Sequence, residues 1–229
     1  MNKPHDLPFP KASEGLQSAI DYCSTLLRKD GCDDAPSWVI QSGALMAVFR
    51  IFHKDGKLAA LFDRNNSYDM AMLVWCLEAD RREQKLDINE TGGVCGDAYY
   101  PSVEELDAAS CGEPESGVEA PKPEPPTPQP SIDIGSQFPP IFLPSEKLKA
   151  MLSVYENHIV NSTPDEHRPW ELMASSMITA YRTFHQTDEL CILFDFDNEF
   201  DVAMYAWCVE VNRSRAESDS KATALAKRN

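Results

Sequence analysis

Residues 37–53 read SWVIQSGALMAVFRIFH, and residues 169–185 read PWELMASSMITAYRTFH. In each stretch the large apolar residues advance by seven, four and three positions: Trp38, Leu45, Phe49 and Phe52 in the first, Trp170, Met177, Tyr181 and Phe184 in the second. Such spacing places side chains on one face of an α-helix. We therefore predict a helix over about 37–53 and its counterpart in the second stretch.

The two stretches belong to a longer internal repeat. All four tryptophans of the chain form pairs 132 residues apart, Trp38 with Trp170 and Trp75 with Trp207. Residues 8–83 align without gaps on residues 140–215, with 21 identities in 76 positions. Self-similarity of this kind indicates that one structural unit occurs twice. We expect a tandem duplication of a three-helix module, with the two copies forming a pseudo-twofold pair, that is, a pseudo-dimer within one chain.

The repeat divides the chain into four parts. The first module covers 1–83 and the second covers 140–215. Between them, 84–139 is an acidic linker with six prolines within 121–130, a composition that favours extended backbone and a solvated, disordered tether. After 215 the apolar pattern fades, so 216–229 is expected to be a polar, frayed tail.

The other helices of each module are also visible in the pattern. Ser13-Glu14 and Ser145-Glu146 each precede apolar residues spaced three and four apart, as expected for an N-cap serine and an acidic first turn. Near the end of each module, Tyr68 to Trp75 and Phe200 to Trp207 again carry their apolar residues on one helical face. Each module is thus expected to contain three main helices.

The short apolar runs 58–62 and 190–194 leave a choice of fold class. Their composition suggests buried strands, which would pair across the pseudo-twofold axis. The fold is therefore mainly α, or α+β if these runs are strands. A hairpin turning at Asp55-Gly56 is disfavoured because the second copy has Thr187-Asp188 there.

The chain carries a formal net charge of -16, unevenly distributed. Residues 1–83 hold ten basic and twelve acidic side chains, 84–139 hold two and eleven, and 140–229 hold nine and fourteen. An acidic surface repels nucleic-acid phosphates but attracts a basic protein surface. We expect a protein partner with a basic surface, and neither direct nucleic-acid binding nor membrane insertion.

Several features argue for a cytoplasmic protein without a cofactor. No apolar run is long enough to span a bilayer, and residues 1–10 do not resemble a signal peptide. Seven cysteines without a CxxC spacing argue against a disulfide framework or a zinc knuckle. Cys76, Cys191 and Cys208 are expected to be small buried hydrophobic residues.

Some polar residues are identical in the two copies and are candidates for chemistry. One set has two interpretations, either oxygen ligands for a metal ion or caps for the third helix of each module: Asp63, Asn66 and Asp69, with Asp195, Asn198 and Asp201. Capping is favoured, because the glycine and the glutamate of an EF-hand calcium loop are missing. An enzyme is the alternative hypothesis. It would have a metal-dependent site at the repeat interface built from His53, Asp63, Asp69, His185, Asp195 and Asp201. The competing interpretation of His53 and His185 is a favourable interaction with the C-terminus of the second helix.

The favoured hypothesis is a non-enzymatic interaction protein. Its candidate partner-binding residues are Asp188, Glu189, Asp195, Asp197, Glu199, Arg50 and Arg182, because the second module is acidic where Lys54, Lys57 and Arg64 interrupt the first. Two similar modules suit a bivalent binder or inhibitor. One form would be an antagonist of nucleic-acid-binding machinery, of the mobile-element or phage anti-defence type. Arg50 is also expected to pair with Asp63. Together with Glu78 and Arg81, it is expected to form ion pairs that link the second and third helices.

Overall fold

The computed structural model describes residues 9–32, 35–89, 142–163 and 167–226. Within these residues the protein is mainly helical and contains no strand. The elements are α1 (Glu14–Leu27), the π-helical turn η2 (Arg28–Cys32), α2 (Ser37–Lys54), α3 (Leu58–Leu61), α4 (Ser67–Asn89), α7 (Glu146–Ser162), α8 (Pro169–Gln186), α9 (Leu190–Leu193) and α10 (Glu199–Ala226). The bounds of α2 and α8, and those of α3 and α9, differ by 132 residues at both ends.

The prediction of strands at 58–62 and 190–194 is wrong. Both runs form one helical turn, α3 and α9, closed by hydrogen bonds from the Phe62 and Phe194 amides to the carbonyls of Leu58 and Leu190. An apolar run this short does not distinguish a strand from a buried helical turn. The α+β alternative therefore does not apply to the described residues.

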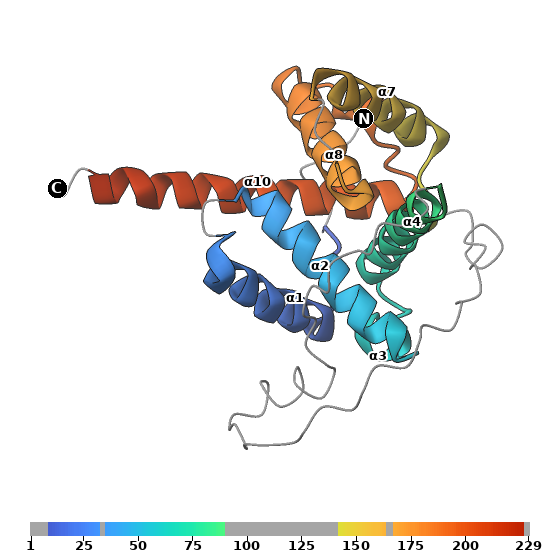
Figure 1. Ribbon diagram of the computed structural model, residues 1–229. Coiled ribbons are helices and arrows are strands. Elements are labelled where there is room, and N and C mark those ends of the chain that lie inside the picture. Colours follow the sequence, from blue (N-terminus) through green and yellow to red (C-terminus); the bar gives the residue numbers. More distant parts are fainter. Residues whose placement is uncertain (1–8, 33–34, 90–141, 164–166, 227–229) are drawn as a thin grey trace.

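Two predicted boundaries also change. Helix α4 continues to Asn89, beyond the expected module end at 83, and α10 continues to Ala226, although the segment after 215 was expected to fray. The rest of the predicted linker, 90–139, lies outside the described residues. Figure 1 shows the C-terminal part of α10 projecting beyond the other helices.

The helices of the two halves are interleaved. Helix α1 packs along α2, and α7 packs along α8, while α2 contacts α8 and α4 contacts both α8 and α10 (Figure 1). At the α2–α8 contact, a Cβ atom added to Gly43 would lie 3.4 Å from the Trp170 ring. The buried apolar side chains of both halves form one continuous cluster. The two halves therefore pack against each other.

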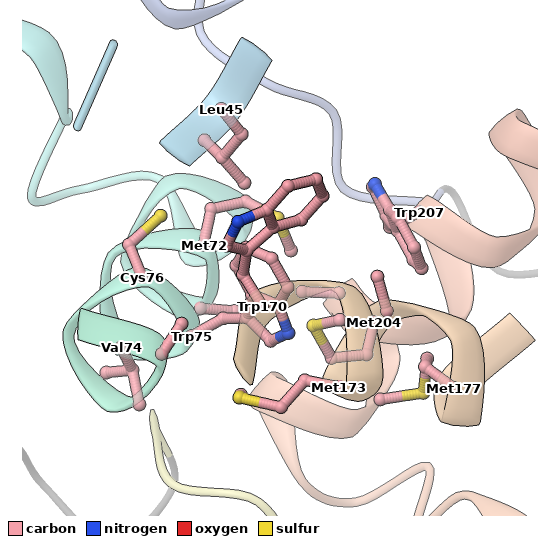
Figure 2. Close-up of a cluster of buried hydrophobic side chains, with 14 of the residues drawn as sticks. Leu45, Met72, Val74, Trp75, Cys76, Trp170, Met173, Met177, Met204 and Trp207 are labelled. Carbon is pink, nitrogen blue, oxygen red and sulfur yellow. The ribbon is translucent and has the colours of Figure 1, made fainter. Parts of the chain in front are cut away.

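Three tryptophans belong to the core cluster where the halves join. Figure 2 shows Trp75 of α4, Trp170 of α8 and Trp207 of α10 in this cluster together with Met72, Met173, Met177 and Met204. All three are buried, with 4%, 7% and 5% of their surface exposed, whereas Trp38 is half-buried against the same cluster. This confirms the interpretation of the tryptophans as core residues.

Helices α2 and α8 end in the same way. After α2, the Lys57 amide donates to the Phe52 carbonyl and Gly56 has φ 69°; after α8, the Glu189 amide donates to the Phe184 carbonyl and Asp188 has φ 58°. This is the Schellman arrangement, in which a residue in the left-handed conformation closes the helix. Among the described residues, no helix has the length and apolar character needed to cross a membrane.

Candidate functional site

Asp69 and Asp201 are buried and serve as structural clamps. The Asp69 carboxylate accepts hydrogen bonds from the amide of Ser13 at 2.9 Å, from the Ser13 hydroxyl at 2.6 Å and from the amide of Asp63 at 2.9 Å. Asp201 accepts from the matching groups of Ser145 and Asp195 at 3.0, 2.6 and 2.9 Å. Each carboxylate thus ties the start of one helix to the turn that precedes another.

The asparagines complete these clamps. The Asn66 side chain accepts from the amides of Tyr68 and Asp69, which caps α4, and donates to the Lys11 carbonyl. Asn198 likewise accepts from the Asp201 amide and donates to the Leu143 carbonyl. The capping role expected of both asparagines is confirmed. The aspartates bind the first helix of each half and the preceding turn, rather than the amide of the cap residue itself.

Burial and hydrogen bonding have opposite effects on the pKa of the Asp201 carboxyl. Desolvation raises its pKa, while the bonds donated by Ser145 and Asp195 oppose that rise. Since three donors already surround its two oxygens, the carboxylate is held as a structural acceptor.

The six residues of the enzyme hypothesis do not form a metal-binding group. His53 stacks on Phe49 of its own helix with ring centroids 5.0 Å apart, and the His185 ring lies 5.3 Å from that of Tyr181, tilted by 43°. Both histidines lie in the last turn of their helices, as expected. Within the described ranges, no three side chains of the His, Cys, Asp or Glu type are placed to hold a metal ion.

The acidic residues of the second half lie mostly at the surface. Asp188, Glu189, Asp197 and Glu199 are exposed and Asp195 is half-buried, whereas Asp201 belongs to the clamp. Lys147 reaches this region by donating to the carbonyls of Cys191 and Phe194. From 183 to 212 the sequence contains no lysine or arginine. An exposed acidic surface therefore surrounds α9 and the start of α10.

The cysteines divide into two groups. Cys76 and Cys208 are fully buried, as expected, and burial raises the pKa of both thiols. Cys191 is exposed, so the prediction that it is buried is wrong. The run around it forms a single helical turn, of which Leu190 and Leu193 face the core.

Arg50 and Arg182 occupy matched positions but have different surroundings. The ion pairs of Arg50 join it to Asp80, at 4.0 Å, and to Glu83 of α4, rather than to Asp63. Arg50 therefore links the second and third helices, whereas Glu78 pairs with Arg81 at 2.6 Å within α4. The Nε and Nη2 atoms of Arg182 are buried and have no hydrogen-bond partner in the described part of the chain.

Two clefts lie at the junction of the halves, and sequence reasoning did not find them. The first has a volume of about 380 Å³ and lies between α1, α2, α4 and α10. The second has a volume of about 430 Å³ and lies between α4, α7, α8 and α10. We call the first the polar cleft and the second the apolar cleft, according to their linings.

The clefts are built from the same repeat positions. Ten positions line both clefts when the numbering is shifted by 132 residues, in the pairs Gln17/Lys149, Ile20/Leu152, Asp21/Ser153, Ser24/Glu156, Gln41/Met173, Leu45/Met177, Tyr68/Phe200, Trp207/Trp75, Glu210/Glu78 and Ser214/Arg82. In each cleft the tryptophan and glutamate come from the half opposite to the one that supplies the first two helices. Each cleft therefore needs both halves.

At two matched positions the side chains of the apolar cleft are less polar than those of the polar cleft. Met173 and Phe200 in the apolar cleft stand where the polar cleft has Gln41 and Tyr68. Two effects raise the pKa of the Tyr68 hydroxyl: burial, which is the larger, and the negative charge of the Glu210 carboxylate. The apolar cleft thus has the Met173 thioether in place of the Gln41 amide, and the Phe200 ring in place of the Tyr68 phenol. Its walls are therefore mostly apolar. Methionines adapt their shape to different apolar ligands.

A charged bridge closes one edge of the apolar cleft. Arg82 of α4 binds Glu78 at 2.8 Å and Glu156 of α7 at 2.9 Å. Burial opposes ionisation of both Arg82 and Glu78, but their mutual hydrogen bond raises the pKa of Arg82, and the bonds from Arg81 and Arg82 lower the pKa of Glu78. The bridge consequently stays charged, and it joins the halves beside the apolar walls. At the matched place the polar cleft has Ser214, which accepts a hydrogen bond from Gln41 at 3.4 Å.

The alignment of the two repeats already shows the residue differences that distinguish the clefts, from Gln41 to Met173 and from Tyr68 to Phe200. Their common location was not visible, because the lining comes from helices far apart in the sequence.

Comparison with known proteins returns no match: no family model, no curated protein and no solved structure matches this chain.

Proposed function

We propose that this protein is a non-enzymatic protein-binding module, in which one of two related clefts has become an apolar docking site for a partner protein. The two clefts would derive from a tandem duplication that placed two three-helix modules about a pseudo-twofold axis. One observation supports the proposal above all others. At matched positions the second cleft is lined by Met173, Met177 and Phe200, whereas the first is lined by Gln41, Leu45 and Tyr68.

The proposed occupant is a helix of a partner protein with large apolar side chains on one face and lysine or arginine beside them. Grooves between helices commonly receive amphipathic helices through apolar anchors. A volume of about 430 Å³ lies within the usual range for binding pockets. Basic flanking residues are favoured by the net charge of -16 and by the exposed acidic residues of the second half.

The acidic residues Asp188, Glu189, Asp195, Asp197 and Glu199 would increase the association rate with such a partner. Charges at the rim of an interface act mainly on the association rate and its salt dependence. If the partner uses its basic surface to bind nucleic acid, this protein would compete with nucleic acid and act as an inhibitor. Because the clefts differ, bivalent binding would use two non-equivalent sites.

Site-specific photo-crosslinking tests the proposal. Ser153 and Asp21 are exposed and lie at matched positions in the apolar and polar clefts, so a photoreactive amino acid at either one leaves the fold unchanged. We expect a specific protein to be crosslinked from position 153 and not from position 21. Replacement of Asp188, Glu189, Asp197 and Glu199 by their amides should lower the yield and its salt dependence.

Two results would count against the proposal. The first is the same set of crosslinked proteins from positions 153 and 21, which would mean that neither cleft is selective. The second is a crosslinked protein whose yield does not change when Leu152, on the wall of the apolar cleft, is replaced by asparagine.

A further inference from the structure

Glu210 lines the polar cleft at the position where the apolar cleft has Glu78. Glu78 accepts two hydrogen bonds from Arg81, at 2.7 and 2.6 Å. Glu210 accepts the matching two from Arg213, at 3.2 and 2.6 Å. Glu78 in addition binds a second guanidinium, because its Oε1 atom accepts a hydrogen bond from Arg82 Nε at 2.8 Å. A glutamate in this position therefore accommodates two guanidinium groups at once.

The polar cleft has a short neutral side chain where the second arginine stands. Ser214 occupies the position of Arg82, and both residues line their clefts. The matched glutamates differ in exposure accordingly, with 27% of the Glu78 side chain and 51% of the Glu210 side chain exposed. Each carboxylate oxygen accepts up to two hydrogen bonds. The Glu210 carboxylate is therefore accessible from the cleft to a further donor while it remains paired with its neighbour in α10.

A second carboxylate lines the polar cleft from α1. In the apolar cleft Arg82 also binds Glu156 of α7, at 2.9 Å. The residue of α1 matched to Glu156 is Ser24, but Asp21, one helical turn earlier, lines the same cleft. Asp21 is exposed and accepts one hydrogen bond, from Gln17 at 2.9 Å. Each cleft thus combines a glutamate of a long helix with a carboxylate of the first helix of a module.

The charges of the two linings differ by one cation. Two acidic and two basic side chains line the apolar cleft: Glu78, Glu156, Arg82 and Lys149. Two acidic side chains and one basic side chain line the polar cleft: Asp21, Glu210 and the exposed Arg28 of η2. Trp207 and Tyr68 also line the polar cleft, and a planar cation packs favourably on aromatic rings. The polar cleft therefore suits a flat organic cation.

We propose that the polar cleft binds a small molecule that carries a guanidinium group, with Glu210 and Asp21 as its acceptors. The first half identifies the ligand class, because the guanidinium of Arg82 joins the two carboxylates of the matched cleft. A guanidinium presents several N–H donors in one plane, which suits carboxylate recognition. A volume of about 380 Å³ is sufficient for a small ligand. The inference does not rest on the docking proposal, which concerns the apolar cleft.

The test is an NMR titration of the full chain with methylguanidinium chloride, against sodium chloride at constant ionic strength. The indole N–H signals of Trp207 and Trp75 report on the polar and the apolar cleft, respectively. We expect a saturable shift at Trp207 and none at Trp75, where Arg82 already binds the carboxylates. Glu210→Gln should weaken binding about tenfold, through loss of a charge-assisted hydrogen bond. Arg28→Gln should strengthen binding, because a repelling charge is removed.

A second variant supplies the guanidinium within the chain. Ser214→Arg places an arginine four residues after Glu210, as Arg82 follows Glu78, so it should abolish the response at Trp207. This variant keeps the test informative if Glu210→Gln does not fold. The proposal would be overturned by a response that persists in Ser214→Arg, by the absence of a saturable shift, or by equal affinity for methylammonium. Tighter binding of Nα-acetylarginine methylamide than of methylguanidinium would also overturn it, by assigning the site to an arginine of a protein.

Discussion

Asp69 binds Ser13 through both its backbone amide and its hydroxyl, at 2.9 and 2.6 Å, across 56 residues of sequence. The same pair of bonds joins Asp201 to Ser145. Each serine also accepts a hydrogen bond from the amide three residues later, and so caps its helix. The clamp therefore sets the positions of two helix N-termini at once.

Replacement of Asp69 by asparagine should destabilise the protein by about 2–3 kcal/mol, because the amide nitrogen would take the place of an oxygen that accepts one or two of the three hydrogen bonds in this buried site. Urea unfolding would measure the loss, and Asp201→Asn should give a loss of similar size. Asp55→Asn is the control, since Asp55 is exposed and such changes usually stay within about 0.5 kcal/mol. Equal stability of the Asp69 variant and the control would show that the clamp contributes little.

Gly43 of α2 lies against the Trp170 ring of α8. Because an added Cβ would meet the Trp170 ring at an ordinary contact distance of 3.4 Å, Gly43→Ala should be tolerated and should gain up to about 1 kcal/mol from helix propensity. Gly43→Leu should lose about 1–3 kcal/mol through overpacking. Thermal unfolding would measure both, and tryptophan fluorescence would report the displaced ring. A destabilised alanine variant would contradict this account of the contact.

Asp188 adopts a left-handed backbone conformation where the first half has glycine. Asp188→Gly should stabilise the protein by about 0.5–1 kcal/mol, since glycine enters this region without steric cost. Gly56→Asp should have the opposite effect. Chemical unfolding of the matched pair would test the assignment, which requires the two changes to differ in sign.

The helical fold could be predicted from the sequence because the helices carry their own periodicity. The apolar spacing placed α2 over 37–53, one residue short of its observed end at Lys54, and the serine caps placed the starts of α1 and α7. The turns α3 and α9 were missed because four apolar residues have no period. The clefts and the clamps were missed because they join residues from distant helices. The sequence indicated that Arg50 links the second and third helices, but only the structure shows that it pairs with Asp80 and Glu83.

The buried thiols predict a loss of stability at alkaline pH. Burial raises the pKa of Cys76 and Cys208 well above 9.0, so in the folded protein they stay protonated where the unfolded chain ionises. The folded state then binds more protons, and the free energy of unfolding falls as pH rises, by about 1.4 kcal/mol per pH unit for each thiol. The stabilising effect is complete below the pKa of the unfolded thiols and is lost progressively above it.

Unfolding by urea between pH 8 and 10.5 would measure this slope. Cys76→Ala and Cys208→Ala should each make it shallower, whatever they do to the stability at pH 7. Cys191→Ala is the control, because Cys191 is exposed and its removal should leave the slope unchanged. A slope that is insensitive to both buried thiols would refute this explanation.

An exchange of the two linings would test whether Met173 and Phe200 make the second cleft apolar. Met173→Gln with Phe200→Tyr gives the apolar cleft the polar residues of its counterpart, and Gln41→Met with Tyr68→Phe does the reverse. An anionic naphthalene dye that fluoresces in apolar surroundings would report the exposed surface. The first pair should weaken dye binding about fivefold, for a loss of about 1 kcal/mol of apolar contact. The reverse pair should create a second site. Unchanged dye affinity in the first variant, with its fold intact by circular dichroism, would place the apolar surface elsewhere and remove the main support for the docking proposal.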